Sequence, residues 1–156
     1  MRREDGQSTP HNLQPERHAA AEGPLRLAVL AALLCVAVAA VHAIDQHGFP
    51  GNKTSGYVQG LYYALEAGGV LTAAVLLAPR VRIRWLLALS VAVGPIIGYV
   101  LSRGPGLPNY TDDVGNWGEP LGVISLVVES ALLATTVTAL GLARRRVRSY
   151  GHVTQT

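Results

Sequence analysis

Two glutamates lie inside long apolar stretches of this 156-residue chain. Glu66 and Glu129 each come about ten residues after the start of their stretch, which corresponds to the middle of a bilayer. A charged side chain at that depth costs roughly 2.5–3.5 kcal/mol, so we expect both carboxyl groups to face other helices. Two carboxyls that meet at equal depth could share a proton or hold a cation. The alternative is a pair of protonated acids that donate hydrogen bonds between helices.

Polar residues precede each glutamate at helical spacing. Gln59 and Tyr62 share a helix face with Glu66, and Ser125 shares one with Glu129. We therefore predict an intramembrane proton or cation site made of these five side chains, on the condition that the two faces meet.

A second group of side chains with metal-binding chemistry occurs in the sequence VHAIDQHG. His42 and Asp45 are three residues apart and share a helix face, and His47 could fold back toward them. Imidazole and carboxylate groups bind zinc or copper, so a metal site is one interpretation, and no other cofactor is predicted. Contact with lipid headgroups and water is the alternative.

A single arginine, Arg103, is expected at the outward end of a span. A guanidinium group there could bind an anionic headgroup, or it could pair with Asp112, Asp113 or Glu119 in the loop that follows. The alternative is an arginine whose apolar stem lies in lipid while its charged end reaches water.

Four apolar runs must position these side chains, at residues 25–44, 57–78, 83–101 and 120–143. A helix of about 20 residues crosses a hydrocarbon core of about 30 Å. The chain is 49% hydrophobic and only 15% charged, which is typical of a membrane protein. We expect an all-α integral membrane four-helix bundle, with a kink at Pro95 in the third run.

The placement of arginines predicts the orientation of the chain. Arginines cluster before the first run, between the second and third, and after the fourth, whereas the other two connections are mainly acidic. Short basic segments stay in the cytoplasm. We therefore predict a disordered cytoplasmic tail over 1–23, a transmembrane domain over 24–143 and a basic cytoplasmic tail over 144–156, in the plasma membrane. A signal peptide cleaved after Ala43 is an alternative interpretation of the first run.

The two halves of the membrane part resemble each other. Gly48-Phe49-Pro50 pairs with Gly106-Leu107-Pro108 at a constant offset, and the glutamates follow with a shift of one residue in register. This pattern favours a tandem duplication of a two-helix hairpin. Glycines four apart, such as Gly94 and Gly98, predict close helix packing within the bundle or in a homodimer.

The stretch LSRGPGLPNYTDDVGNWGEPLGVISLVVES, residues 101–130, resembles a segment of uncharacterised four-span integral membrane proteins of actinobacteria. The pattern positions are Ser102, Arg103, Gly106, Leu107, Pro108, Gly115, Trp117, Glu119, Pro120 and Glu129. The chain departs from the pattern at Gly104-Pro105, where a more polar pair is expected. The resemblance implies a membrane location and no particular chemistry.

Several functions are disfavoured by the sequence. It contains no GxSxG, Walker or HExxH motif, and Cys35 is the single cysteine. The net charge of +3 resides at the ends of apolar runs, so no nucleic-acid partner is expected. We predict a non-enzymatic binding, transport or accessory subunit that contacts the bilayer and forms a homodimer or larger complex. The alternatives are a proton- or cation-coupled carrier that uses Glu66 and Glu129, and an outward-facing metal-dependent enzyme that uses His42, Asp45 and His47.

Overall fold

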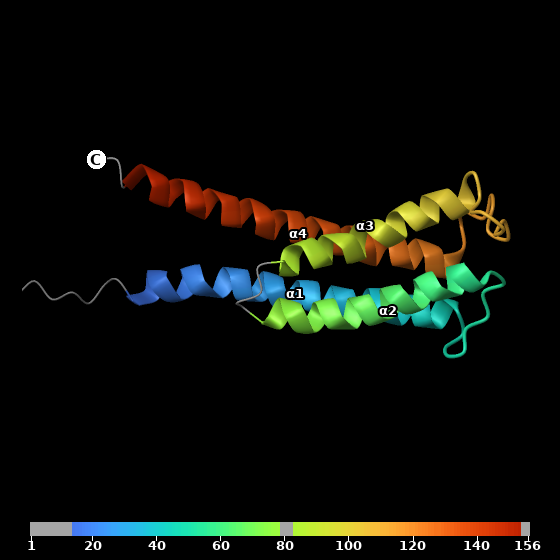
Figure 1. Ribbon diagram of the computed structural model, residues 1–156. Helices are drawn as coiled ribbons and strands as arrows, with labels where there is room; N and C mark the ends of the chain where they lie inside the picture. Colours follow the sequence, from blue (N-terminus) through green and yellow to red (C-terminus); the bar gives the residue numbers. More distant parts are fainter. Residues whose placement is uncertain (1–13, 79–82, 154–156) are drawn as a thin grey trace, which may run out of the picture.

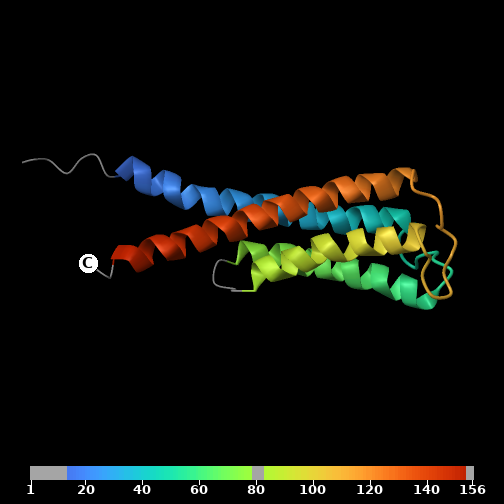
Figure 2. The same ribbon diagram turned by 90° about the horizontal axis from the view of Figure 1, so that it is seen from above.

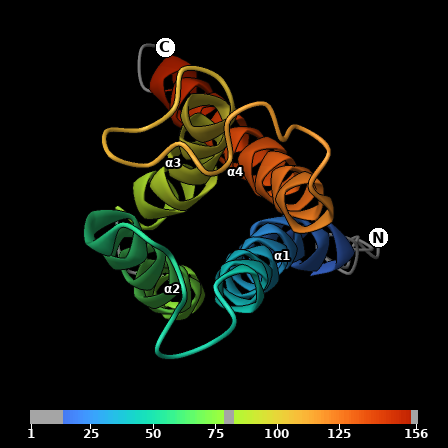
Figure 3. The same ribbon diagram turned by 90° about the vertical axis from the view of Figure 1, so that its right-hand side faces the viewer.

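The computed structural model describes residues 14–78 and 83–153. Four helices follow one another in this part of the chain: α1 Gln14–Asp45, α2 Gly56–Leu77, α3 Arg84–Arg103 and α4 Pro120–Val153. They run antiparallel, each helix packs against the next, and α4 closes the bundle against α1 (Figures 1 and 3). The predicted all-α four-helix bundle is therefore confirmed.

The two ends of the bundle differ. The helices α1 and α4 have 32 and 34 residues, whereas α2 and α3 have 22 and 20. The additional turns of α1 and α4 project at the end where both termini lie (Figure 2), which we name the termini end. The connections 46–55 and 104–119 form the opposite end, which we name the long-loop end (Figure 1).

Each helix contains an apolar segment long enough to cross a bilayer, namely Leu25–Asp45, Gly56–Leu77, Arg84–Arg103 and Pro120–Arg145. These segments begin and end within two residues of the predicted spans. Their large aliphatic side chains point outward, and Leu33, Leu71 and Val127 are 64%, 66% and 65% exposed. Such a surface is unfavourable in water and favourable in lipid. The chain is a multi-pass membrane protein.

The helices extend further than the sequence predicted at the termini end. A disordered tail was expected over 1–23, but α1 begins at Gln14, and residues 1–13 lie outside the described part. The sequence PERHAAAE explains the early start, because proline suits the first helical turn and alanine and glutamate favour helix. The predicted basic tail over 144–156 is likewise helical as far as Val153, since arginine is a good helix former.

Besides residues 1–13, two further parts of the prediction lie outside the described residues. These are the last three residues of the chain and the connection 79–82, which contains Arg80 and Arg82 of the predicted cytoplasmic loop. Within the described part, α3 continues through Pro95 without interruption.

A buried apolar cluster packs the half of the bundle nearer the termini end. The buried cluster there consists mainly of small side chains: Ala31, Ala32, Cys35, Val38, Ala73, Leu76, Ala88, Val91, Ala92 and Leu132. Small residues let backbones approach where lipid supplies no hydrophobic drive for association. Two helix backbones approach closely at Gly69 of α2, where an added Cβ would lie 2.9 Å from the carbonyl oxygen of Cys35 in α1. Gly94 and Gly98, the glycines predicted to allow close packing, do not lie against another helix backbone within the bundle, because a Cβ at either position would meet no atom within 4 Å.

Helices α1 and α3 end with the same hydrogen-bond pattern. The N–H of Gly48 donates to Ala43 O at 2.8 Å, and the N–H of Gly106 donates to Leu101 O at 2.9 Å. Both glycines have a positive φ, of 85° and 84°, which glycine adopts without a steric penalty. These are the two glycines that the predicted duplication pairs. The duplication itself stays a prediction, since glycine caps of this kind are common in unrelated helices.

The Gly69 contact generates a stability prediction. Gly69→Ala should destabilise the protein by about 1–3 kcal/mol, because the new methyl group overlaps the α1 backbone. Gly141→Ala is the matched control, since its Cβ meets no atom within 4 Å and alanine favours helix. Thermal unfolding of the purified variants in detergent measures both effects. A Gly69→Ala variant as stable as Gly141→Ala would contradict the close approach of α1 and α2.

Candidate functional site

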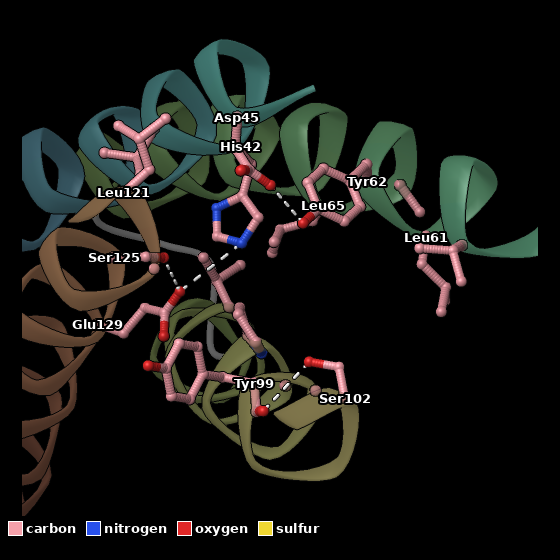
Figure 4. A pocket seen from close by; sticks show the side chains of 18 of the residues that line it. His42, Asp45, Leu61, Tyr62, Leu65, Tyr99, Ser102, Leu121, Ser125 and Glu129 are labelled. Carbon is pink, nitrogen blue, oxygen red and sulfur yellow. Dashed lines mark hydrogen bonds and ion pairs between the residues drawn. The ribbon is translucent and has the colours of Figure 1, made fainter. Parts of the chain in front are cut away.

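A cavity of about 500 Å³ lies mainly in the half of the bundle nearer the long-loop end, and between α2 and α3 it extends as far as Thr72 and Leu87. All four helices and the connection 104–119 contribute to its walls. Much of the lining is apolar, including Val58, Leu61, Leu65 and Leu121, and polar side chains are grouped among these (Figure 4).

Glu129 of α4 is the most deeply buried acidic side chain of the cavity wall, with 1% of its surface exposed. Its Oε1 accepts a hydrogen bond from Ser125 one turn earlier, at 2.5 Å, which realises the predicted helix-face pairing. The Nε2 of His42 lies 3.8 Å from the same oxygen, beyond hydrogen-bond distance. The other oxygen, Oε2, has no hydrogen-bond partner within the described residues.

His42 faces Glu129 from α1 in a defined orientation. Its Nδ1 lies 2.9 Å from the carbonyl oxygen of Val38, and a carbonyl only accepts hydrogen bonds, so Nδ1 carries a proton. A neutral His42 therefore presents the lone pair of Nε2 toward Glu129. Figure 4 shows the imidazole and the carboxyl group pointing toward each other across the cavity.

Asp45 and Tyr62 form the adjoining part of the wall. The Tyr62 hydroxyl donates to Asp45 Oδ2 at 2.5 Å, and Lys53 Nζ contacts the same oxygen at 2.7 Å. The Tyr62 ring packs against the His42 ring with centroids 5.4 Å apart. Asp45 is thus fully engaged by an ammonium and a phenol group, and Tyr62 holds His42 in place.

Arg103 lies at the end of α3 with only 8% of its side chain exposed. Its Nη1 donates to Asp113 at 3.2 Å, and its Nη2 lies 3.6 Å from Glu119. Pairing of Arg103 with the loop carboxylates was one of the predicted interpretations. The structure pairs Arg103 with Asp113 and Glu119. The third candidate, Asp112, instead accepts a hydrogen bond from Thr54. The Nε of Arg103 is buried without a hydrogen-bond partner in the described part of the chain.

Glu119 joins Arg103 to the beginning of α4. Its carboxylate accepts hydrogen bonds from the backbone N–H groups of Leu121 and Gly122, which is the geometry of a helix N-cap. A Cβ at Gly122 would lie 2.7 Å from the Tyr99 ring and 3.1 Å from Arg103 Nη2, so this position needs glycine. The Tyr99 ring also stacks on the guanidinium group, 4.4 Å from Arg103 Cζ.

The connection 104–119 is joined to the beginning of α2 and to the connection 46–55 above the cavity. The Tyr57 hydroxyl donates to the carbonyl oxygen of Pro108 at 2.6 Å, and Thr54 donates to Asp112 at 2.7 Å. Within the connection 104–119, Tyr110 donates to Asp113. Burial and this hydrogen bond raise the pKa of the Tyr110 phenol above its ordinary value, so Tyr110 stays a donor at neutral pH.

Glu66 does not join Glu129. Its Oε1 accepts a hydrogen bond from Gln46 Nε2, and its side chain lies in a shallow apolar groove lined only by α1 and α2 residues. Gln59 donates to the same Gln46 at 2.7 Å. The five side chains predicted to form one site are therefore divided, with Tyr62, Ser125 and Glu129 at the cavity and Gln59 and Glu66 bound to Gln46.

The predicted metal ligands also have separate partners. His42 contacts Val38 and Glu129, Asp45 contacts Lys53 and Tyr62, and the Nδ1 of His47 lies 2.9 Å from the Asn52 amide. No group of three His, Cys, Asp or Glu side chains suited to a metal ion occurs in residues 14–78 and 83–153. The zinc or copper interpretation has no support in this geometry.

The sequence analysis missed Tyr99 of the cavity wall and Gln46, which binds Gln59 and Glu66 beside the cavity. Gln46 is 1% exposed and connects α1 to α2, yet a lone glutamine after a helix gives no signal of that role. Tyr99 was missed as well, although it lies four residues before Arg103 and so one helical turn away.

Comparison of this chain with protein-family models, curated proteins and solved structures found no match.

The Arg103 contacts generate a second prediction. Arg103→Met should destabilise the protein by about 1–3 kcal/mol, because Asp113 and Glu119 lose their cation. Combining it with Asp113→Asn should recover part of that loss, since one unpaired charge is removed. Unfolding of the parent, both single variants and the double variant measures the coupling. Additive effects would show that the pair does not contribute to stability.

Proposed function

We propose that this membrane protein binds a small, mainly apolar molecule in the cavity between its four helices, as a binding or transport protein. The observation that carries the proposal is the cavity itself, about 500 Å³ in volume with apolar walls and a few buried polar atoms. Sites for small molecules in proteins have this size range and composition.

The composition of the cavity walls indicates what can fill the space. Water is a poor filler, because each buried molecule needs two to four polar partners and apolar walls offer few. A molecule with an apolar body and a small polar group fits both the walls and the unpaired atoms of Glu129 and Arg103.

The orientation of the cavity follows from the charges at the two ends. Arg26, Arg84, Arg144 and Arg145 lie at the termini end, whereas Lys53 and Arg103 at the long-loop end are each bound to carboxylates. The positive-inside tendency supports a plasma-membrane protein with cytoplasmic termini and a cavity in the outward half of the bilayer.

A second candidate function is proton- or cation-coupled transport. The observation that favours it is the facing pair of His42 and Glu129, with 3.8 Å between Nε2 and Oε1. This pair takes the place that the sequence analysis gave to Glu66 and Glu129. An accessory subunit of a larger complex would instead use the outer helix faces and leave the cavity without a specific occupant.

The binding proposal predicts the effect of filling the cavity. Gly98 lines the cavity and an added Cβ there meets no atom within 4 Å, so Gly98→Leu should occupy part of the cavity and remove small molecules that co-purify with the parent. Gly60→Leu is the matched control, since it is also a helical glycine with free space but lies outside the cavity wall. Mass spectrometry of organic extracts from the purified proteins measures the difference. Identical extracts from all three proteins would overturn the proposal.

The orientation is tested by labelling in intact cells. In a Cys35→Ser background, Val114→Cys at the long-loop end should react with a membrane-impermeant maleimide, whereas Thr156→Cys should react only after the cells are opened. The reverse pattern would place the cavity on the cytoplasmic side.

A further inference from the structure

We infer that the cavity selects a lipophilic cation, a molecule with an apolar body and a protonated amine, and that Glu129 is its counter-ion. The inference rests on the proposed binding function and adds to it the chemical class of the ligand. It follows from the distribution of charges, of hydrogen-bond acceptors and of unpaired atoms around the cavity.

The cavity wall carries an excess of acidic groups. It includes four carboxyl groups, Asp45, Asp113, Glu119 and Glu129, against the single guanidinium of Arg103. Lys53 neutralises Asp45 from beside the cavity, and Arg103 is shared by the two loop carboxylates. Glu119 is further stabilised by two backbone N–H groups at the beginning of α4. Glu129 is the carboxyl group of the wall that has no Lys or Arg partner among the described residues.

The groups that face Glu129 leave one of its two oxygens without a donor. Ser125 satisfies part of Oε1, whereas Oε2 is buried and unpaired. A neutral His42 directs a lone pair toward the same carboxyl, because its proton is held by Val38. Ser125 is the one donor that the described residues direct at this carboxyl group, and it contacts Oε1 alone. A protonated amine would donate to Oε2 and would also be stabilised by the lone pair of His42 Nε2, which lies 3.8 Å from Oε1.

An anionic ligand is disfavoured by the same contacts. The Nη atoms of Arg103 already contact Ser102, Asp113 and Glu119, so an added anion would meet two carboxylates beside the guanidinium. The remaining donor of Arg103, Nε, carries one N–H and suits a neutral acceptor such as a carbonyl or ether oxygen. The walls between these polar groups, including Leu65 and Val91, suit an apolar body.

The test uses three probes that share a phenylbutyl body and end in an ammonium, a methyl or a carboxylate group. These are 4-phenylbutylamine, pentylbenzene and 5-phenylpentanoate. Binding to the full-length protein in phosphatidylcholine nanodiscs is measured at neutral pH, with protein-free discs to subtract partition into lipid. The parent should bind the ammonium probe at least about 10-fold more tightly than the other two, as one charge-assisted hydrogen bond provides.

Two carboxyl variants locate the counter-ion. Glu129→Gln keeps the shape of the side chain and should abolish the preference for ammonium, while Glu66→Gln, in the separate groove, should leave it unchanged. If Glu129→Gln does not fold, His42→Gln replaces it and should weaken ammonium binding severalfold, because one facing acceptor is displaced.

The possible outcomes distinguish failure of the cation preference from failure of the proposed binding function. Equal binding of all three probes, lost in Gly98→Leu, would overturn the cation preference and leave the binding function standing. Tighter binding of the carboxylate probe would also overturn it and would indicate a protonated His42 that already neutralises Glu129. Binding that Gly98→Leu does not change for any probe would show that the cavity is not the binding site.

Discussion

The structure depends on one constraint, which is that helices in lipid associate closely only where small side chains let their backbones meet. In the half nearer the termini end, alanines and Gly69 satisfy this constraint, and the buried side chains there form a packed cluster. In the other half the inward positions carry larger polar residues such as His42, Tyr62 and Glu129, which bond to one another or to nearby backbone. The cavity exists because close packing ends where these residues begin.

The fold could be predicted because membrane spans are encoded along the chain, in runs of apolar residues whose length matches a bilayer. The rotation of each helix about its axis is not encoded so directly. Glu66 and Glu129 lie at similar depth, yet Glu66 faces a groove against Gln46 while Glu129 faces the cavity. A change of one residue in position turns a side chain by roughly 100° around a helix, so a small difference in spacing decides which neighbour the side chain meets. Depth was therefore predictable, and the meeting of the two carboxyls was not.

In the candidate site, contacts within one helix were predictable from the sequence, whereas contacts between elements were less so. Contacts within one helix turn, such as Ser125 with Glu129, follow from spacing alone. Contacts from the long connections, such as Asp113 with Arg103, depend on the path of a loop, which local sequence does not determine. His42 was selected for its chemistry, but its partner was wrongly sought in the neighbouring residues Asp45 and His47. It lies on α4 instead, because a helix in a bundle faces the helices beside it as much as its own loop.

The bundle inverts the size order of a water-soluble protein, with alanines inside and leucines outside. Lipid chains are fluid and adapt to any aliphatic contour, so an exposed position such as Leu33 or Val127 constrains its residue by polarity and hardly by shape. An interior position such as Ala31 or Ala92 has room for a methyl group and little more. Among descendants of this chain, the outer surface should therefore drift freely among Leu, Ile, Val and Phe. The buried alanine positions should instead keep small residues, because a larger side chain does not fit between the helices.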